Sequence, residues 1–194
     1  KAVVVGISLG GSVTAAFGVH HPDRTAGLVF LAPATHPWPG GVDWHYEVAA
    51  LPLIGPLFAS TIAPIAASLI GRKAAKAAFD PNPAPEGYFD AQGVPLLFRG
   101  GSFRANGLDV ANLKAHVSAL SPRYREISAP TVIITGDQDP IVYPSIHSHG
   151  LARDIAGARL IELPGIGHMP HHVETEVCVD AILAVADTGH GRVP

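Results

Sequence analysis

The sequence predicts an α/β protein with a parallel sheet and an inserted, mostly helical segment. Short apolar runs rich in β-branched residues, at 2–5, 26–31 and 130–135, are typical of strands buried on both faces. Helix-length segments separate these runs in the order that βαβ units require. The alternation stops near residue 35 and resumes after residue 121. We therefore predict a core interrupted by an insertion.

The N-terminal part of the core, residues 1–34, has the pattern strand, turn, helix, strand. The run at 2–5 is Ala-Val-Val-Val, and it meets a glycine-rich turn at 6–11. An alanine- and valine-rich helix is predicted at 12–20, and a second strand at 26–31. A strand, a helix and a strand in this order imply parallel strands joined by a right-handed crossover.

The insertion, residues 35–121, differs from its surroundings in its proline and aromatic content. Prolines at 52, 56 and 64 and the Pro-x-Pro-x-Pro linker at 81–85 break short helical patterns. Most aromatic residues of the chain fall between 38 and 103, and an amphipathic helix is predicted at 111–120. This part is predicted to be an inserted, mostly helical subdomain with a small core of its own.

Regular alternation resumes in residues 122–188. Strands are predicted at 130–135 and 158–163, and helices at 143–155 and 173–186. The polar, glycine-rich tail at 189–194 is predicted to fray. The loops at 136–142 and 163–170 follow the two strands of this part.

Charge and cysteine content exclude several function classes. The 13 Lys and Arg against 16 Asp and Glu give a net charge of −3 without a basic block, which argues against nucleic-acid binding. Cys178, the one cysteine, rules out an intramolecular disulfide and a cysteine zinc cluster. No phosphate-binding or dinucleotide fingerprint is present, so no cofactor is implied. His147 and His149, two residues apart, do not share a helix face, and no metal site is expected.

The segment Gly6-Ile7-Ser8-Leu9-Gly10 lies where the first strand meets the first helix. This is the context of a nucleophile elbow, in which a tight turn projects a serine out of the sheet. Gly6 and Gly10 are favoured because residues two before and two after the nucleophile crowd their neighbours. Amides at the start of the helix can stabilise developing negative charge. A glycine-rich turn with an incidental serine is the alternative.

Residues 2–31, with this turn and His21-Pro22-Asp23-Arg24 before the second strand, resemble the middle of an α/β-hydrolase fold protein. The resemblance implies the order nucleophile, acid, histidine along the chain. The sequence Gly-Asp-Gln-Asp-Pro-Ile-Val at 136–142 resembles the acid loop of the family. On that pattern Asp139 is the acid and Asp137 is a neighbour, although a surface loop carboxylate would look the same without Ser8.

The sequence Leu-Pro-Gly-Ile-Gly-His-Met-Pro at 163–170 resembles the family's histidine loop. His168 is then the catalytic histidine. His171 and His172 are its nearest rivals, and they are expected to cap the last helix or to face solvent.

The resemblance therefore implies a serine hydrolase that acts on a small to medium apolar carboxylic ester. Ser8 attacks, His168 accepts its proton and Asp139 orients the imidazole; the backbone N–H of Leu9 is one oxyanion donor. A C–C bond hydrolase and a cofactor-free perhydrolase or haloperoxidase use the same triad and stay open. Ile7 stands where many relatives have histidine, which we interpret as tuning of pocket polarity.

The chain opens at Lys1 and enters a strand at once. This predicts that an N-terminal portion is absent from the sequence, that it completes the sheet in cis or in trans, and that it brings the second oxyanion donor. Residues 1–194 alone are then a catalytically incomplete fragment, which is a further alternative. A cytoplasmic location is expected, although a signal peptide would lie outside the sequence.

No charged residue occurs between Glu47 and Arg72. The stretch is long enough to cross a bilayer, for which about 20 apolar residues suffice. A membrane span would split one parallel sheet across two sides of the membrane, so it is disfavoured. A cap over the active site that supplies the acyl pocket is the preferred interpretation, and a membrane-touching lid is the intermediate one.

Overall fold

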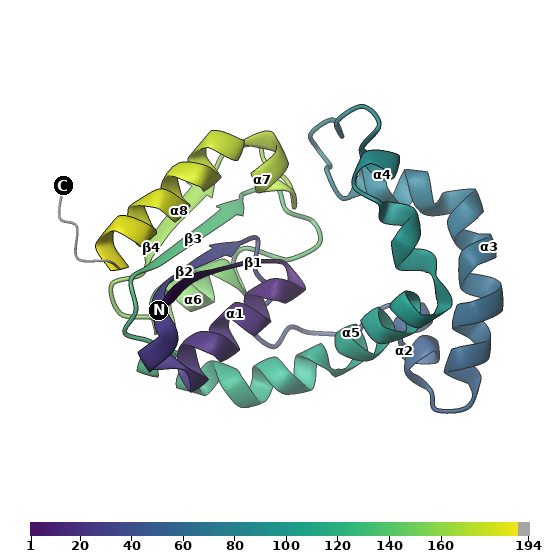
Figure 1. Ribbon diagram of the computed structural model, residues 1–194, viewed down its shortest axis with the longest axis horizontal. Helices are drawn as coiled ribbons and strands as arrows, with labels where there is room; N and C mark the ends of the chain where they lie inside the picture. The colour runs from purple at the N-terminus through teal and green to yellow at the C-terminus, as the bar shows by residue number, and fades with distance from the viewer. Residues whose placement is uncertain (190–194) are drawn as a thin grey trace. The chain divides into compact units, whose positions relative to one another are not determined.

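The computed structural model describes residues 1–189, which form two compact units (Figure 1). Unit 1 contains Lys1–Pro37, Asp80–Asn82 and the described residues from Ala115 onward. Unit 2 contains Trp38–Phe79 and Pro83–Lys114. The tail at 189–194 is predicted to fray, and its residues 190–194 lie outside the described part of the chain.

Unit 1 is built on a parallel sheet of four strands in the order β1-β2-β3-β4. The strands are β1 (Ala2–Ile7), β2 (Thr25–Leu31), β3 (Thr131–Gly136) and β4 (Arg159–Leu163). Its α-helices are α1 (Leu9–His20), α6 (Ser148–Asp154), α7 (Pro170–Val173) and α8 (Thr175–Gly189), with 3-10 turns η1 (Pro22–Arg24) and η3 (Ser121–Glu126). The predicted fold class, an α/β protein with a parallel sheet and flanking helices, is confirmed.

Both faces of the sheet are covered, which explains the continuous apolar strands. Every residue of β2 is buried. Phe30 packs with residues of α1 and α6 on one face, whereas Val29 packs with residues of α8 on the other. Figure 1 shows α8 on one side of the strands and α1 with α6 on the opposite side. The side chains of successive strand residues point to opposite faces, so a doubly covered strand must be apolar throughout.

Two elements of unit 1 differ from their predicted bounds. The helix predicted at 143–155 is helical only over α6, because Tyr143 O accepts from both Ile146 N and His147 N in a turn that precedes it. The helix predicted at 173–186 is divided into α7 and α8, and α8 continues to Gly189. The change of direction lies at Glu174, whose φ of −121° and ψ of 55° are not helical.

Strand β1 lies at one edge of the sheet, and within residues 1–189 it pairs with β2 alone. Its Val5 side chain is 41% exposed, although the strand is apolar. An exposed apolar edge offers unpaired backbone groups to another strand. The expectation that a further segment pairs here stays a prediction.

Unit 2 is helical. It contains α2 (Trp44–Ala50), α3 (Ile54–Ala77), α4 (Tyr88–Ala91), the 3-10 turn η2 (Val94–Phe98) and most of α5 (Gly100–Leu120). The prediction that prolines break the helix was wrong at two positions, because α3 runs through Pro56 and Pro64. Pro56 lies in the first turn, where its missing N–H has no helical partner in any case. Helix α5 is also longer than the helix predicted at 111–120.

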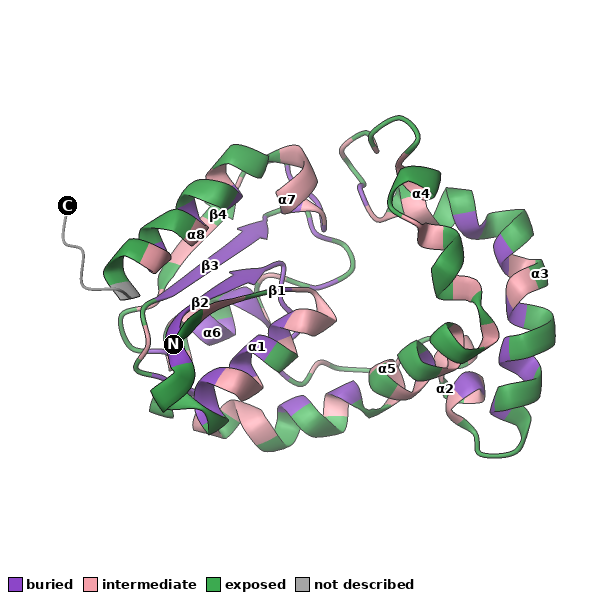
Figure 2. Ribbon diagram, in the orientation of Figure 1, coloured by how far each residue is buried: buried purple, intermediate pink, exposed green. Residues whose placement is uncertain are grey.

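Helix α3 turns small residues inward and large aliphatic residues outward. Its buried face repeats every four residues with Ala59, Ala63, Ala67 and Gly71. Its exposed positions include Ile54, Leu57, Ile62, Ile65, Leu69 and Ile70, and green exposed segments follow the ribbon of α3 in Figure 2. By length and composition alone, α3 could cross a membrane. Large aliphatic side chains exposed along one helix are typical of a site of interaction when they form a patch.

Candidate active site

Ser8 has the strained backbone that a nucleophile elbow requires. It follows β1 directly and precedes α1, and its φ of 51° and ψ of −121° are unusual for a residue with a side chain. Its N–H donates to Leu31 O at 3.0 Å, and its carbonyl accepts from Gly11 N and Ala34 N, each at 2.9 Å. The strain is therefore held by the turn itself and by β2 and the segment after it.

The two elbow glycines are not equivalent. A Cβ atom on Gly6 would overlap Thr14 Oγ1 and the backbone of Gly10. Apart from its chain neighbours and the backbone of α1, a Cβ atom on Gly10 would meet no atom of the described residues within 4 Å. The sequence analysis expected a side chain to be too crowded at both glycines. Within unit 1 the structure shows this crowding at Gly6 but not at Gly10.

We expect Gly6→Ala to destabilise unit 1 and Gly10→Ala to leave its stability unchanged or slightly higher. The clash at Gly6 involves backbone, which cannot rotate away, and overpacking of this kind costs about 1–3 kcal/mol. Alanine at Gly10, inside α1, gains helix propensity of up to about 1 kcal/mol. Urea unfolding followed by circular dichroism measures both. Equal midpoints for the two variants would contradict the asymmetry.

Leu9, the predicted oxyanion donor, is the first residue of α1. Amides in the first turn of a helix have no partner within the helix, and the helix dipole places partial positive charge there. The backbone N–H next to Ser8 thus belongs to a helix end that favours an anion.

Asp139 and His168 form a buried pair. His168 Nδ1 lies 2.7 Å from Asp139 Oδ2, and the two residues are 6% and 4% exposed. Asp139 Oδ1 accepts from Ile141 N at 2.8 Å and from Val142 N at 2.9 Å. A carboxylate only accepts, so His168 carries its proton on Nδ1 and its Nε2 is the basic atom. This is the tautomer that a general base needs.

The three predicted residues lie at one edge of the sheet. Ser8 follows β1, Asp139 follows β3 and His168 follows β4, and the carboxyl ends of parallel strands share an edge. The structure joins Asp139 to His168 directly. Among the contacts of residues 1–189, it records no hydrogen bond from Ser8 Oγ to His168. Catalytic hydrogen bonds often form only when substrate is bound.

Asp137 and Asn82 hold the histidine loop. Asp137 Oδ1 accepts from Gly165 N at 2.7 Å, so this rival of Asp139 has a structural contact instead. Asn82 Nδ2 donates to Gly165 O at 3.0 Å, and Asn82 Oδ1 accepts from Gly167 N at 2.9 Å. Sequence reasoning missed Asn82, which lies in the proline-rich linker more than 80 residues away. Asparagine between two prolines was the one local signal.

Of His171 and His172, the structure places His171 in a setting that was not expected. They lie on the short helix α7 with ring centroids 4.2 Å apart. His171 Nδ1 is buried without a hydrogen-bond partner among the described residues. Burial, and then the neighbouring His172 and His168, lower the pKa of His171 to about 4. His171 therefore stays neutral beside His168 and does not simply face solvent.

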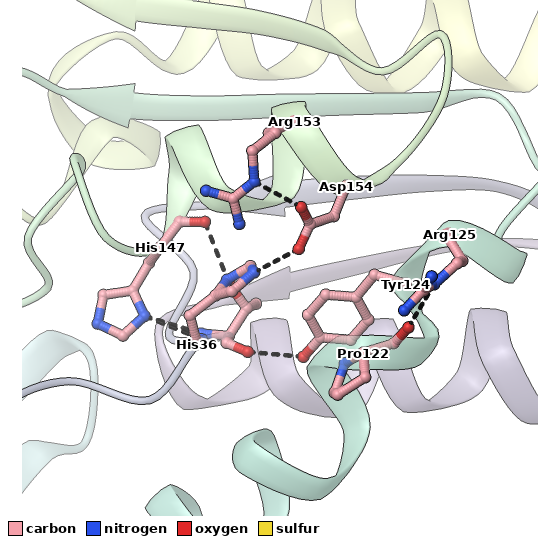
Figure 3. A network of polar contacts seen from close by, with 8 residues as sticks. His36, Pro122, Tyr124, Arg125, His147, Arg153 and Asp154 are labelled. Carbon is pink, nitrogen blue, oxygen red and sulfur yellow. Dashed lines mark hydrogen bonds and ion pairs between the residues drawn. The ribbon is translucent and has the colours of Figure 1, made fainter.

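A second polar cluster joins the buried His36, Tyr124 and His147 to the partly exposed Asp154 (Figure 3). His147 Nδ1 accepts from Thr35 N at 3.2 Å and from His36 N at 3.1 Å. Tyr124 Oη donates to Thr35 O at 2.7 Å, and His36 Nε2 lies 3.1 Å from Asp154 Oδ2. None of these contacts was predicted from the sequence.

Burial dominates the electrostatics of this cluster. It lowers the pKa of His147 to about 4, with His36 lowering it further and Asp139 opposing the shift. Burial likewise lowers the pKa of His36, against the hydrogen bond to Asp154, and raises that of Tyr124. His149 instead contacts Glu162 at 3.2 Å, so it does not pair with His147. Within residues 1–189 no three His, Cys, Asp or Glu side chains gather as metal ligands.

Comparison with known proteins agrees with this architecture. The Alpha/beta hydrolase family profile matches residues 1–181. Structural neighbours include a hydrolase from Pseudomonas aeruginosa PA01, 26% identical with a TM-score of 0.62. They also include a putative lipase from Acinetobacter baumannii AYE, 19% identical with a TM-score of 0.65, and the enol-lactonase from Burkholderia xenovorans LB400, 21% identical with a TM-score of 0.62.

Each of these three alignments covers 95% of this chain, but only 64%, 61% and 65% of the respective neighbour. The chain thus spans less than two thirds of their length. The family profile extends over nearly the whole chain, from β1 into α8, and it includes the elbow, the acid loop and the histidine loop. The chain belongs to the Alpha/beta hydrolase family.

Proposed function

We propose that the protein is a serine hydrolase that cleaves a small to medium apolar carboxylic ester through Ser8, His168 and Asp139. One observation carries the proposal: a strained serine between strand and helix shares a sheet edge with a buried, hydrogen-bonded Asp139–His168 pair. These are the nucleophile, base and orienting group of acyl transfer.

In the proposed mechanism, Ser8 Oγ attacks the ester carbonyl and its proton passes to His168 Nε2. Asp139 stays ionised and stabilises the imidazolium through Nδ1. The Leu9 N–H donates to the developing oxyanion, and the alcohol leaves with the proton from His168. A water molecule activated by His168 then hydrolyses the acyl-enzyme and restores Ser8.

The apolar preference is supported by unit 2. Its longest helix, α3, exposes large aliphatic side chains, among them Leu57 and Ile65 at 65% and 63%. Binding sites for small molecules are lined mainly by apolar side chains with a few polar groups. Unit 2 is accordingly proposed as the cap that supplies the acyl-binding surface.

A fluorophosphonate probe tests the nucleophile. Ser8 Oγ is expected to displace fluoride and form a stable phosphonate ester, which peptide mass spectrometry locates. Ser8→Ala should abolish labelling. Ser12→Ala is the matched control, because Ser12 lies one turn further along α1 and its hydroxyl donates to Leu9 O at 2.7 Å. Labelling of another serine, or none at Ser8, would contradict the assignment.

Two other chemistries on the same triad are also supported by structural neighbours. One is described as a putative non-heme bromoperoxidase from Mycobacterium tuberculosis H37Rv, and another as a meta-cleavage product hydrolase. A panel of p-nitrophenyl esters, a ring-cleavage diketone and a peroxide-dependent halogenation assay separates the three. Turnover greatest on the esters supports the main proposal.

The exposed edge of β1 favours a further alternative, in which full ester turnover needs a segment that pairs with β1 and brings the second oxyanion donor. A missing oxyanion donor costs about 10²–10³ in turnover. Ser8 would then react with the phosphonate while ester turnover stays low. A soluble monomer with ordinary esterase rates would contradict this alternative.

A further inference from the structure

The segment directly after β2 uses three successive backbone N–H groups to hold two different loops. Ala34 N donates to Ser8 O at 2.9 Å. Thr35 N and His36 N donate to the same acceptor, His147 Nδ1, at 3.2 and 3.1 Å. Residues 34–36 thus touch the elbow with one amide and His147 with the next two.

His147 stands at the far end of the loop that carries Asp139. The loop leaves β3 at Gly136, folds around the Asp139 carboxylate through Ile141 N and Val142 N, and reaches His147 just before α6. His147 is 3% exposed. Its ring is therefore a fixed anchor for the loop and not a surface side chain.

The anchor works in one protonation state only. Two backbone N–H groups point at His147 Nδ1, so this atom carries no proton and the neutral ring is protonated at Nε2. His36 is more adaptable. When neutral it donates from Nε2 to Asp154, and its Nδ1 accepts from the Thr35 hydroxyl at 3.0 Å. When charged it donates from both atoms, and the Thr35 hydroxyl turns to His147 O at 3.3 Å.

We propose that His147 is a positioning residue whose Nδ1 ties the Asp139 loop to residues 34–36, the segment that also holds the Ser8 carbonyl. Ser8, which follows β1, and Asp139, which follows β3, are thereby kept in register at the edge of the sheet. Figure 3 shows His147 beside His36, with Tyr124 and Asp154 completing the cluster. This role rests on the proposed function, because the register of Ser8 and Asp139 matters when both serve one reaction.

Residues 34–36 are held firmly enough to serve as a reference. Tyr124 Oη, in a fully buried side chain, donates to Thr35 O at 2.7 Å. Ala32 N donates to Ile134 O at 2.8 Å, and Ala32 itself has a strained φ of 42°. Strained residues persist where their surroundings over-determine them. The anchor therefore connects the acid loop to a rigid part of unit 1.

The test uses the whole chain with three variants. His147→Leu removes the acceptor, His147→Asn returns an oxygen near the place of Nδ1, and His149→Asn is the matched control at an exposed neighbour. Two rates are measured: phosphonate labelling of Ser8, and hydrogen exchange of the Thr35 and His36 amides by NMR. Circular dichroism verifies folding. Amide exchange does not depend on any activity.

His147→Leu is expected to slow Ser8 labelling by about 10²-fold, the loss that a displacement of about 1 Å causes. Its two amides should exchange at least about tenfold faster, because they lose their acceptor. His147→Asn should restore both rates to within a few-fold, and His149→Asn should match the wild type. Rescue by asparagine separates positioning from mere packing.

The proposal is overturned if His147→Leu labels at the wild-type rate, or if its amides stay protected. It is also overturned if the Thr35 and His36 amides are protected in His147→Asn but Ser8 is still labelled slowly. This last criterion decides the question if His147→Leu does not fold. Protected wild-type amides with no labelling of wild-type Ser8 would instead contradict the proposed function, and the positioning role with it.

Discussion

Ser8→Ala and His168→Ala are each expected to lower kcat for ester hydrolysis by about 10⁶, and the double variant by no more than either one. Residues that act as one catalytic unit show this non-additivity, because removing the base leaves the nucleophile inactive and the reverse. Initial rates on p-nitrophenyl butyrate, normalised to the concentration of folded protein, measure the three losses.

The buried Asp139–His168 pair makes the comparison of the two single variants with the double variant informative about the triad. His168 is held by the Asp139 carboxylate, so its Nε2 has a defined orientation before Ser8 is considered. His172→Ala is the matched control, because His172 neighbours the same loop and is more exposed. Losses that multiply in the double variant would show that Ser8 and His168 act independently, and the triad would be wrong.

The two central strands, β2 and β3, were predictable because they are buried on both faces. A strand such as β2, with every residue buried, must be an apolar run, and such a run is visible without any tertiary information. Glycine on both sides of Ser8 likewise signals a local backbone demand. The structure narrows that demand to Gly6.

Elements and contacts that depend on long-range packing were harder to predict from the sequence. Pro64 predicted a break, but α3 continues because its alanine face packs within unit 2. The pairing of Asp139 with His168 was expected from a family pattern, since no local rule relates residues 29 apart. His147 and Thr35 are separated by 112 residues, and no periodicity or motif predicts that a histidine ring will accept from that amide. Asn82 is a similar case.

Asp139→Asn is expected to lower kcat by about 10⁴ while it leaves the fold intact. The asparagine oxygen can still accept from Ile141 N and Val142 N, as Oδ1 does now. The amide nitrogen would then face His168 and donate to Nδ1. This donation forces the proton of the imidazole onto Nε2, which can no longer accept from Ser8. Kinetics on the same ester, and the downfield proton resonance of His168 Nδ1–H, report the tautomer.

Asp137→Asn is the matched comparison, because both carboxylates lie on the loop after β3. Asp137 Oδ1 accepts a single bond from Gly165 N, which asparagine can also accept, so the loss should stay below about tenfold. The resonance of the His168 ring proton should vanish in Asp139→Asn and persist in Asp137→Asn. A larger loss in the Asp137 variant would exchange the roles of the two residues, since only the acid that faces Nδ1 sets the tautomer on which the base depends.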